Sequence, residues 1–238
     1  MSTPSIPLTG AGLRAPSRIS AVSAMWSALW IIAERLLAAA ALLLLMPVLA
    51  AVALLVRIAS RQSPFIAHRR VGRHGKEFWM LKVRTMWHRE TWNRETWNRE
   101  ARVRTSFFIE QLPPETHVPA SKTAPDPRIT SRLALFLRRF SFDELPQLLH
   151  VLTGRMRLVG PRPVTRSEWN AYYGPSDNDV LAVAPGITGL WQVTGRNRLT
   201  YAQRRRLDKF YARRSSPGFD LLLLLRTPAR VFTGRDAS

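Results

Sequence analysis

The chain has 238 residues, and its 36 lysines and arginines outnumber its 16 aspartates and glutamates to give a formal net charge of +20. This length is typical of one domain with a sizeable hydrophobic core. So large a positive charge requires an anionic partner, for which nucleic acid, anionic lipid headgroups and nucleotide-sugars all qualify. The sequence contains no cysteine, which excludes disulfides and thiolate metal sites.

The first quarter of the chain predicts a disordered segment followed by a membrane-inserted helix. Residues 1–25 are assigned to a basic, disordered segment because the first twenty are rich in Pro, Ser and Gly. Trp26 and Trp30 are four residues apart and share a helical face, as aromatics at a membrane interface do. Residues 36–56 carry no charge. A straight helix of that length is about 31 Å long, enough for the hydrocarbon core.

Pro47, in the middle of this apolar run, predicts a re-entrant helix rather than a spanning one. Proline removes a backbone hydrogen bond and kinks a helix. Arginines precede and follow the run, so the positive-inside rule is best met when both ends stay cytoplasmic. We therefore expect residues 26–59 to enter the membrane and return, and residues 60–238 to form a cytoplasmic catalytic domain.

Residues 65–84 have the pattern of a β-hairpin, with two apolar-rich arms around Gly72 and Gly75. On the second arm, the alternation of strand side chains places Lys82 and Arg84 on one face. Two neighbouring cations of this kind can clamp a diphosphate. The alternative is a solvated basic edge that discourages strand pairing, and the pattern alone leaves both interpretations open.

The segment that follows the hairpin contains two irregular stretches and a helix. Residues 89–98 duplicate the sequence RETWN with charges of alternating sign, so we interpret them as a solvated helical insertion. Residues 111–125 form a proline-rich loop that can move over a site. Residues 131–140 are predicted to be a helix whose leucines and phenylalanines make one core-packing stripe.

Two adjacent carboxylates, Asp143 and Glu144, follow Arg138 in the sequence. Leucines at helical spacing come next and predict a helix that ends near Gly154. Ser141 and Glu144 fit a capping box, and the helix N-terminus should keep both carboxylates ionised. An ionised pair beside arginines can hold a divalent cation and attack a phosphorus centre. Ordinary helix capping is the alternative, although a cap does not need the flanking cations.

The C-terminal third contains a glycine-rich loop and two helices. Residues 185–197 combine three glycines with Trp191 and Arg196. Glycine lets the backbone approach a ligand, tryptophan offers a stacking face and arginine a phosphate fork, although such a loop alone is more often a turn. Residues 201–214 predict a basic helix. Residues 219–232 are apolar and basic by turns, which suits a helix lying in the membrane interface.

Four ordered blocks of the sequence resemble one known family. They are HRRVGRHGKEFWMLKVRTM (68–86), DPRIT (126–130), FDELPQLLHVLTGRMRLVGPRP (142–163) and PGITGLWQVTGRN (185–197). Over residues 33–232 the chain resembles the bacterial sugar transferases, which are monotopic polyprenyl-phosphate phosphoglycosyl transferases. Within that family it is most similar to the short exopolysaccharide-initiating members that transfer galactose-1-phosphate or glucose-1-phosphate to undecaprenyl phosphate.

The resemblance implies an α+β, mostly α fold: a monotopic membrane protein with a re-entrant N-terminal helix, a small β-hairpin and amphipathic interfacial helices. It also implies an enzyme on the cytoplasmic face of the bacterial inner membrane, in contact with its lipids. The enzyme would transfer a sugar-1-phosphate from a UDP-sugar to polyprenyl phosphate and release UMP. A homodimer is compatible with this assignment, and nucleic acid is not an expected partner.

The resemblance assigns roles to particular residues of this sequence. Asp143 would be the nucleophile that forms a covalent phosphosugar intermediate. Glu144, with Asp143 beside it, would hold Mg²⁺. The cations implied to bind substrate phosphates are Lys82, Arg84, Arg138 and Arg162, and the loop residues implied to bind the nucleotide-sugar are Trp191, Gln192 and Arg196.

Three residues depart from the family pattern just before the Gly-Pro-Arg-Pro turn. The family usually shows Asn-Val-x-x-Gly-Asp/Glu-Met-Ser there, whereas this chain has His150, Arg155 and Arg157. The loss of an acid and the gain of arginine are expected to change how the helix docks or how Arg162 is oriented.

A rival interpretation is a non-catalytic basic protein that binds membranes or nucleic acid. Its support is the net charge of +20 and the eight tryptophans. The long uncharged run and the central carboxylate pair favour the enzyme, because carboxylates in the middle of a basic field repel a phosphate backbone.

Overall fold

The computed structural model describes residues 21–86, 108–112, 131–195 and 199–233. The helices are α1 (Ala21–Ser60), α3 (Arg132–Arg139), α4 (Leu148–Leu152), α5 (Arg166–Tyr172), α6 (Asn178–Ala182), α7 (Leu190–Thr194), α8 (Tyr201–Arg214) and α9 (Pro217–Thr233), with short 3₁₀ turns η1 (Arg73–Gly75), η2 (Phe142–Gln147) and η3 (Pro175–Asp177). The strands are β1 (Phe65–Val71), β2 (Glu77–Val83), β3 (Ile109–Gln111), β4 (Arg157–Val159) and β5 (Gly186–Thr188). This composition confirms a mostly helical α+β fold. The RETWN duplication, DPRIT and most of the proline-rich loop lie outside the described residues.

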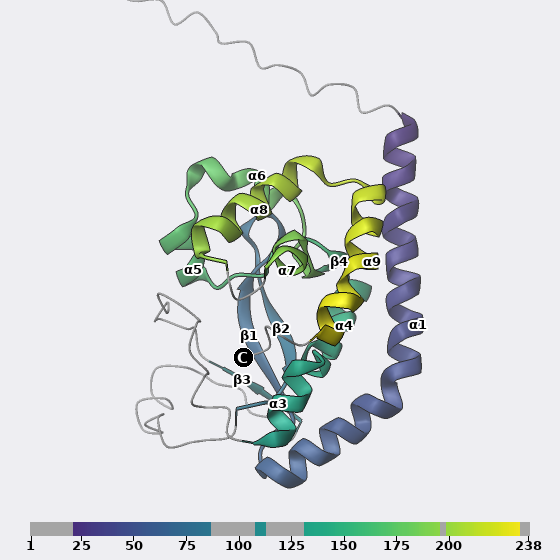
Figure 1. Ribbon diagram of the computed structural model, residues 1–238, viewed down its shortest axis with the longest axis vertical. Coiled ribbons are helices and arrows are strands. Elements are labelled where there is room, and N and C mark those ends of the chain that lie inside the picture. The colour runs from purple at the N-terminus through teal and green to yellow at the C-terminus, as the bar shows by residue number, and fades with distance from the viewer. Residues whose placement is uncertain (1–20, 87–107, 113–130, 196–198, 234–238) are drawn as a thin grey trace, which may run out of the picture.

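The long apolar helix predicted near the N-terminus is confirmed as α1. It is a continuous helix of 40 residues that contains Pro47, and it already includes residues 21–25, which the composition assigned to the disordered segment. Figure 1 shows α1 running along the side of the domain and bending in its C-terminal half. One face packs on the domain through Ala38, Val52 and Val56, while the other exposes large apolar side chains. By length and composition α1 could cross a membrane.

The predicted hairpin is confirmed and belongs to a three-stranded sheet with the order β2-β1-β3. The antiparallel register pairs Phe65 with Val83 at one end and Val71 with Glu77 at the other. At the turn, Gly75 has φ +72°, a left-handed conformation that favours glycine. β3 then pairs in parallel with β1, so the described part of the loop region adds a strand that the sequence pattern did not predict.

Two apolar clusters hold these elements together. The larger one joins β2 to α4, β4, α7, α8 and α9, with Met80, Val151 and Tyr211 among its buried members. The smaller one joins the C-terminal half of α1 to β2 and α3 through Val56, Val83 and Leu137. The hairpin therefore packs on α4 and the C-terminal helices through Met80 and on α1 and α3 through Val83, and β2 also packs against the segment that carries the two adjacent carboxylates.

Buried ion pairs attach α1 to the C-terminal half of the domain. Arg157 of β4 donates from Nε to Glu34 Oε2 at 2.8 Å and from Nη2 to Asp220 Oδ2 of α9 at 3.1 Å. Asp220 also accepts the indole N–H of Trp30 at 3.1 Å and the hydroxyl of Tyr211 at 2.7 Å. The spacing predicted Trp30 at a membrane interface, whereas its polar atom is used here to dock α1 on α9. Three segments far apart in the sequence are thus joined at one point.

Candidate active site

The two adjacent carboxylates lie on a 3₁₀ turn, η2, rather than at the start of the predicted α-helix. Pro146 falls inside this turn, and regular α-helix begins only at Leu148. The predicted capping box is wrong: Ser141 is in the left-handed region with φ 57°, and its side chain makes no capping bond. The chain reverses sharply after α3, so the backbone carbonyl of Ser141 accepts the N–H of Glu144 at 3.1 Å. The predicted end near Gly154 is confirmed, since this residue has φ +73° directly after the helix.

Lys82 connects the hairpin to both carboxylates. Its Nζ lies 2.9 Å from Glu144 Oε1 and 3.8 Å from Asp143 Oδ2. The strand β2 places this lysine, and packing of β2 against η2 brings the acids to it. Asp143 is buried, with 8% of its surface exposed, whereas Glu144 is half-buried and reaches solvent. Arg138, at the end of α3, is close enough to affect the titration of Asp143.

Burial raises the pKa of Asp143 from its ordinary 3.8 to about 6. The positive charges of Lys82 and Arg138 oppose this rise, and the neighbouring Glu144 adds to it. Burial thus opposes the stabilisation of the Asp143 carboxylate that was expected from a helix N-terminus, because removal of water disfavours the charged form. Asp143 is still mostly ionised at pH 7, as a poorly hydrated carboxylate beside two cations. Such a group is suited to nucleophilic attack.

Arg84 does not join Lys82 at the carboxylates. Its side chain is buried, donates from Nε to the carbonyl of Ser63 at 2.8 Å and forms an ion pair with Glu110 of β3. Glu110 was missed by sequence reasoning, because a three-residue strand gives no periodic signal and its pairing partner is distant in the sequence. The predicted diphosphate clamp is thus divided in this structure: Lys82 faces the carboxylates, and Arg84 faces β3.

Arg162 belongs to a second cluster. Its guanidinium lies 4.9 Å from the centre of the Trp191 ring, and that of Arg204 lies 5.2 Å from the same ring. Arg204 also lies over Tyr201 at 5.3 Å. Trp191 is only 5% exposed, so its predicted stacking face is occupied by arginines. Sequence reasoning missed Arg204, which is one of several arginines on the basic helix α8 and has no distinguishing spacing.

The remaining loop predictions have different outcomes. Gln192 of α7 donates its amide to the carbonyl of Ile187 at 2.7 Å, and Arg196 lies outside the described residues. The glycines permit close backbone approach, as predicted, but to another strand instead of a ligand. A Cβ on Gly186 would lie 2.0 Å from the backbone N of Gly160, where β4 and β5 pair. These glycines hold the Gly-Pro-Arg-Pro turn against the loop.

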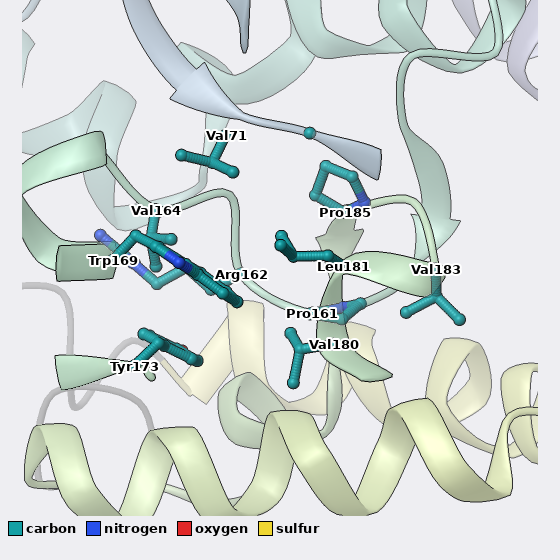
Figure 2. A pocket seen from close by; sticks show the side chains of 11 residues that line it. Val71, Pro161, Arg162, Val164, Trp169, Tyr173, Val180, Leu181, Val183 and Pro185 are labelled. Atoms are coloured by element: carbon teal, nitrogen blue, oxygen red, sulfur yellow. The ribbon is translucent and has the colours of Figure 1, made fainter. Parts of the chain in front are cut away.

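A small pocket lies beside Arg162 at the turn end of the hairpin (Figure 2). Val71, Trp169 and Tyr173 are among the side chains that line it. Lys82 pairs with Ile66, which is five residues from Val71, or about 17 Å along the strand. The structure therefore groups Arg162 with this pocket and the Trp191 cluster, at the opposite end of the hairpin from Lys82.

A buried carboxyl supports the Arg162 turn from beneath. Asp208 of α8 accepts the Tyr173 hydroxyl at 2.9 Å and the backbone N–H of Arg162. Burial raises the pKa of Asp208 to about 7, against the opposing effects of these hydrogen bonds and of nearby arginines. Asp208 fixes the backbone of the turn, which leaves the guanidinium of Arg162 to extend toward the pocket and Trp191.

The donor set at η2 fits a magnesium ion that is shared with a substrate. Among the described residues there is no group of three or more histidine, aspartate or glutamate side chains that would hold a metal alone. Mg²⁺ in phosphate chemistry is commonly held by one or two carboxylates together with substrate phosphates. Asp143 and Glu144 supply two carboxylates of this kind.

Two of the three residues that depart from the family pattern, His150 and Arg157, have defined partners. His150 Nε2 accepts the backbone N–H of Leu81 at 3.0 Å, which anchors α4 on the edge of β2. Burial, assisted by the charge of Arg155, lowers the pKa of His150 to about 4, so the ring is a neutral acceptor at pH 7. Arg157 completes the ion pairs with Glu34 and Asp220. His150 and Arg157 thus connect the segment before the turn to β2, α1 and α9.

The sequence of the chain is similar to a known protein family and to several of its members. The family model described as Bacterial sugar transferase matches residues 26–234. The Exopolysaccharide production protein ExoY of Rhizobium meliloti (strain 1021) is 36% identical over 203 residues, which cover 84% of each chain. The UDP-galactose-lipid carrier transferase of Erwinia amylovora is 39% identical over 181 residues, which cover 75% of this chain and 36% of that protein. The UDP-glucose:undecaprenyl-phosphate glucose-1-phosphate transferase of Xanthomonas campestris pv. campestris is 35% identical over 214 residues, 86% and 39% of the two chains.

Proposed function

Because this chain belongs to the bacterial sugar transferase family and is a transferase, we propose that it moves a sugar-1-phosphate from a UDP-sugar to undecaprenyl phosphate and releases UMP. The similarity to ExoY further suggests a role in starting exopolysaccharide synthesis. Family membership sets aside the rival interpretation of a non-catalytic basic protein.

The observation that carries this proposal is the buried Asp143 carboxylate with Lys82 beside it. In the first step an oxygen of Asp143 attacks the sugar-bearing phosphorus, and the bond from that phosphorus to the bridging oxygen breaks. UMP leaves with the bridging oxygen, and the phosphosugar remains on the carboxylate. In the second step an oxygen of undecaprenyl phosphate attacks the same phosphorus, which gives a diphosphate-linked sugar and frees Asp143.

The surrounding residues reduce the negative charge that opposes each attack. Lys82 and Arg138 neutralise phosphate oxygens near Asp143, as cations do in phosphoryl transfer. A Mg²⁺ ion held by Glu144, with Asp143 beside it, would offset the charge of the diphosphate. We assign Arg162, with Arg204 and Trp191, to the nucleotide end of the donor, because this cluster lies at the other end of the hairpin.

The test is to incubate the protein with a UDP-sugar labelled in the sugar, without lipid acceptor, and to look for label on the denatured chain. Wild type should carry the label and release UMP, whereas Asp143→Asn should do neither at any Mg²⁺ concentration. Glu144→Gln should retain labelling when Mg²⁺ is in excess, because it keeps the nucleophile and loses a metal ligand. Label on Asp143→Asn would assign the nucleophile to another residue. Turnover by wild type without any label would favour direct attack by the lipid phosphate.

We further propose that α1 is re-entrant and that the domain lies on the cytoplasmic face of the inner membrane. Support comes from Pro47 inside α1, from the bend in Figure 1 and from arginines on both flanks of the apolar run. Single cysteines introduced at Ser17 and Ser60 should both be protected from an impermeant reagent outside the cell. Labelling at Ser17 from outside would show that α1 spans the membrane.

A further inference from the structure

Three phenylalanine rings gather where α3 meets η2. The centre of the Phe136 ring lies 4.9 Å from that of Phe140 and 6.0 Å from that of Phe142, with the latter pair nearly parallel. Phe140 and Phe142 are 6.5 Å apart. Phe136 nevertheless leaves 51% of its surface exposed. The cluster therefore presents an apolar surface that the described residues do not cover.

This aromatic cluster adjoins the C-terminal half of α1 through the smaller core cluster. Phe142 packs against the smaller core cluster, in which Val52 and Val56 of α1 meet Leu137 of α3. Figure 1 shows α3 beside the bent, C-terminal part of α1. The rings thus lie next to the apolar contact between α3 and the C-terminal half of α1.

The other side of the cluster leads directly to the reactive carboxylate. Asp143 follows Phe142 in the sequence, and Arg138 lies on α3 between Phe136 and Phe140. The charge of Arg138 acts on Asp143, and Lys82 contacts the same carboxylate. A ligand with an apolar chain and a phosphate head matches this arrangement, since rings meet the chain and cations meet the head.

We propose that Phe136, Phe140 and Phe142 hold the first isoprene units of the polyprenyl phosphate acceptor, with its phosphate between Arg138 and Asp143. This inference rests on the proposed function and names the place of its second substrate. The lipid would arrive after the phosphosugar has formed, when Asp143 is esterified and no longer repels a phosphate. A lipid oxygen then attacks the phosphosugar phosphorus, and the bond to Asp143 breaks. The rings contribute apolar contact to the lipid and none to the nucleotide-sugar.

The test separates the two half-reactions in nanodiscs for wild type, Phe136→Ala and Phe136→Leu. Phe210→Ala is the matched control, because this phenylalanine of α8 is also 51% exposed and contacts another ring. For Phe136→Ala we expect protein labelling by UDP-sugar to stay within twofold of wild type. The apparent KM for undecaprenyl phosphate should rise roughly tenfold, as loss of a large apolar contact predicts. Phe136→Leu should recover part of this loss, and Phe210→Ala should behave as wild type.

Several outcomes would overturn the inference. If Phe136→Ala slows labelling and lipid transfer equally, the ring only supports Asp143. If Phe136→Ala changes neither the labelling rate nor the apparent KM for undecaprenyl phosphate, or changes them only as much as Phe210→Ala does, the rings do not hold the acceptor. If it reduces retention of the protein in washed membranes, the ring contacts the bilayer itself. Absence of UMP release and of labelling in wild type would overturn the proposed function, and the inference with it.

Discussion

Replacing Arg157 with Met should strongly destabilise the protein by leaving a buried carboxylate without its cation. Glu34 is 3% exposed and Asp220 is 1% exposed, and Arg157 is ion-paired with both. Asp220 keeps the hydroxyl of Tyr211 and the indole N–H of Trp30 after the replacement. Glu34 keeps only the backbone of Val159, because its Oε1 has no hydrogen-bond partner in the described part of the chain. Most of the cost should therefore arise at Glu34.

Removal of one partner from a buried ion pair costs about 3–5 kcal/mol. For a chain of this size, 1 kcal/mol corresponds to roughly 2–4 °C, so the melting temperature in nanodiscs should fall by roughly 6–20 °C. Arg157→Lys should cost less, because lysine keeps the positive charge. Some loss should remain, because lysine lacks the planar fork with which arginine reaches both carboxylates. Since the loss is centred on Glu34, adding Glu34→Gln to Arg157→Met should recover a substantial part of it.

A double-mutant cycle of Arg157→Met and Glu34→Gln tests whether the two side chains stabilise each other. Melting curves of wild type, the two single variants and the double variant give the coupling between Glu34 and Arg157 directly. A shift below about 3 °C for Arg157→Met would show that the pair is solvated and does not hold α1. Strictly additive losses would show that the two side chains do not interact, even if each one alone matters.

Four further outcomes test the electrostatics of the site and one hydrogen bond that supports it. Because burial raises the pKa of Asp143 to about 6, the rate of protein labelling at low UDP-sugar concentration should increase with pH through about 6 and then level off. A rate that is constant from pH 5 to 8 would contradict attack by this carboxylate. The same group should make the folded protein less stable as the pH rises from about 4 to 6, since the folded carboxyl keeps a proton that the unfolded one, with its ordinary pKa of 3.8, has lost. Asp143→Asn should remove this slope from the melting temperature, and an unchanged slope would refute the assignment. His150→Leu should cost about 1–3 kcal/mol in thermal or denaturant unfolding, because the backbone N–H of Leu81 loses its acceptor. Lys82→Met should slow labelling by roughly a hundredfold, whereas Lys82→Arg should keep most of the wild-type labelling rate. A labelling rate of Lys82→Met equal to that of wild type would exclude Lys82 from charge stabilisation.

Local patterns in the sequence were sufficient to predict those elements whose structure depends on neighbouring residues. The hairpin follows from alternation around two glycines, and the helix predicted over 201–214 has the same limits in the structure. The helix predicted over 131–140 is observed as Arg132–Arg139, with Ser131 accepting the N–H of Leu133 as its cap. In each case the chemistry that determines the element lies within a few residues of it.

The errors occur where a distant segment decides the outcome. Ser141 and Glu144 are the residue types of a capping box. Because Ser141 adopts a left-handed conformation after α3, its backbone carbonyl, and not its side chain, accepts the N–H of Glu144. The strand pattern placed Arg84 on the same face as Lys82. In the structure the guanidinium of Arg84 instead forms an ion pair with Glu110 of β3 and donates to the carbonyl of Ser63. The burial that raises the pKa of Asp143 likewise comes from packing that no local pattern encodes.

The position of Asp143 relative to α1 follows from two adjacent charges in that helix. Glu34 pairs with Arg157, and the guanidinium of the next residue, Arg35, lies beside the end of α4, where a Cβ on Gly154 would be 2.7 Å from its Nη2. The last carbonyls of a helix attract such a cation. A shift of α1 by one helical turn, about 5.4 Å, would break both contacts together. Since α4 directly follows the turn that carries Asp143, these two charges set the position of the Asp143 carboxylate along α1.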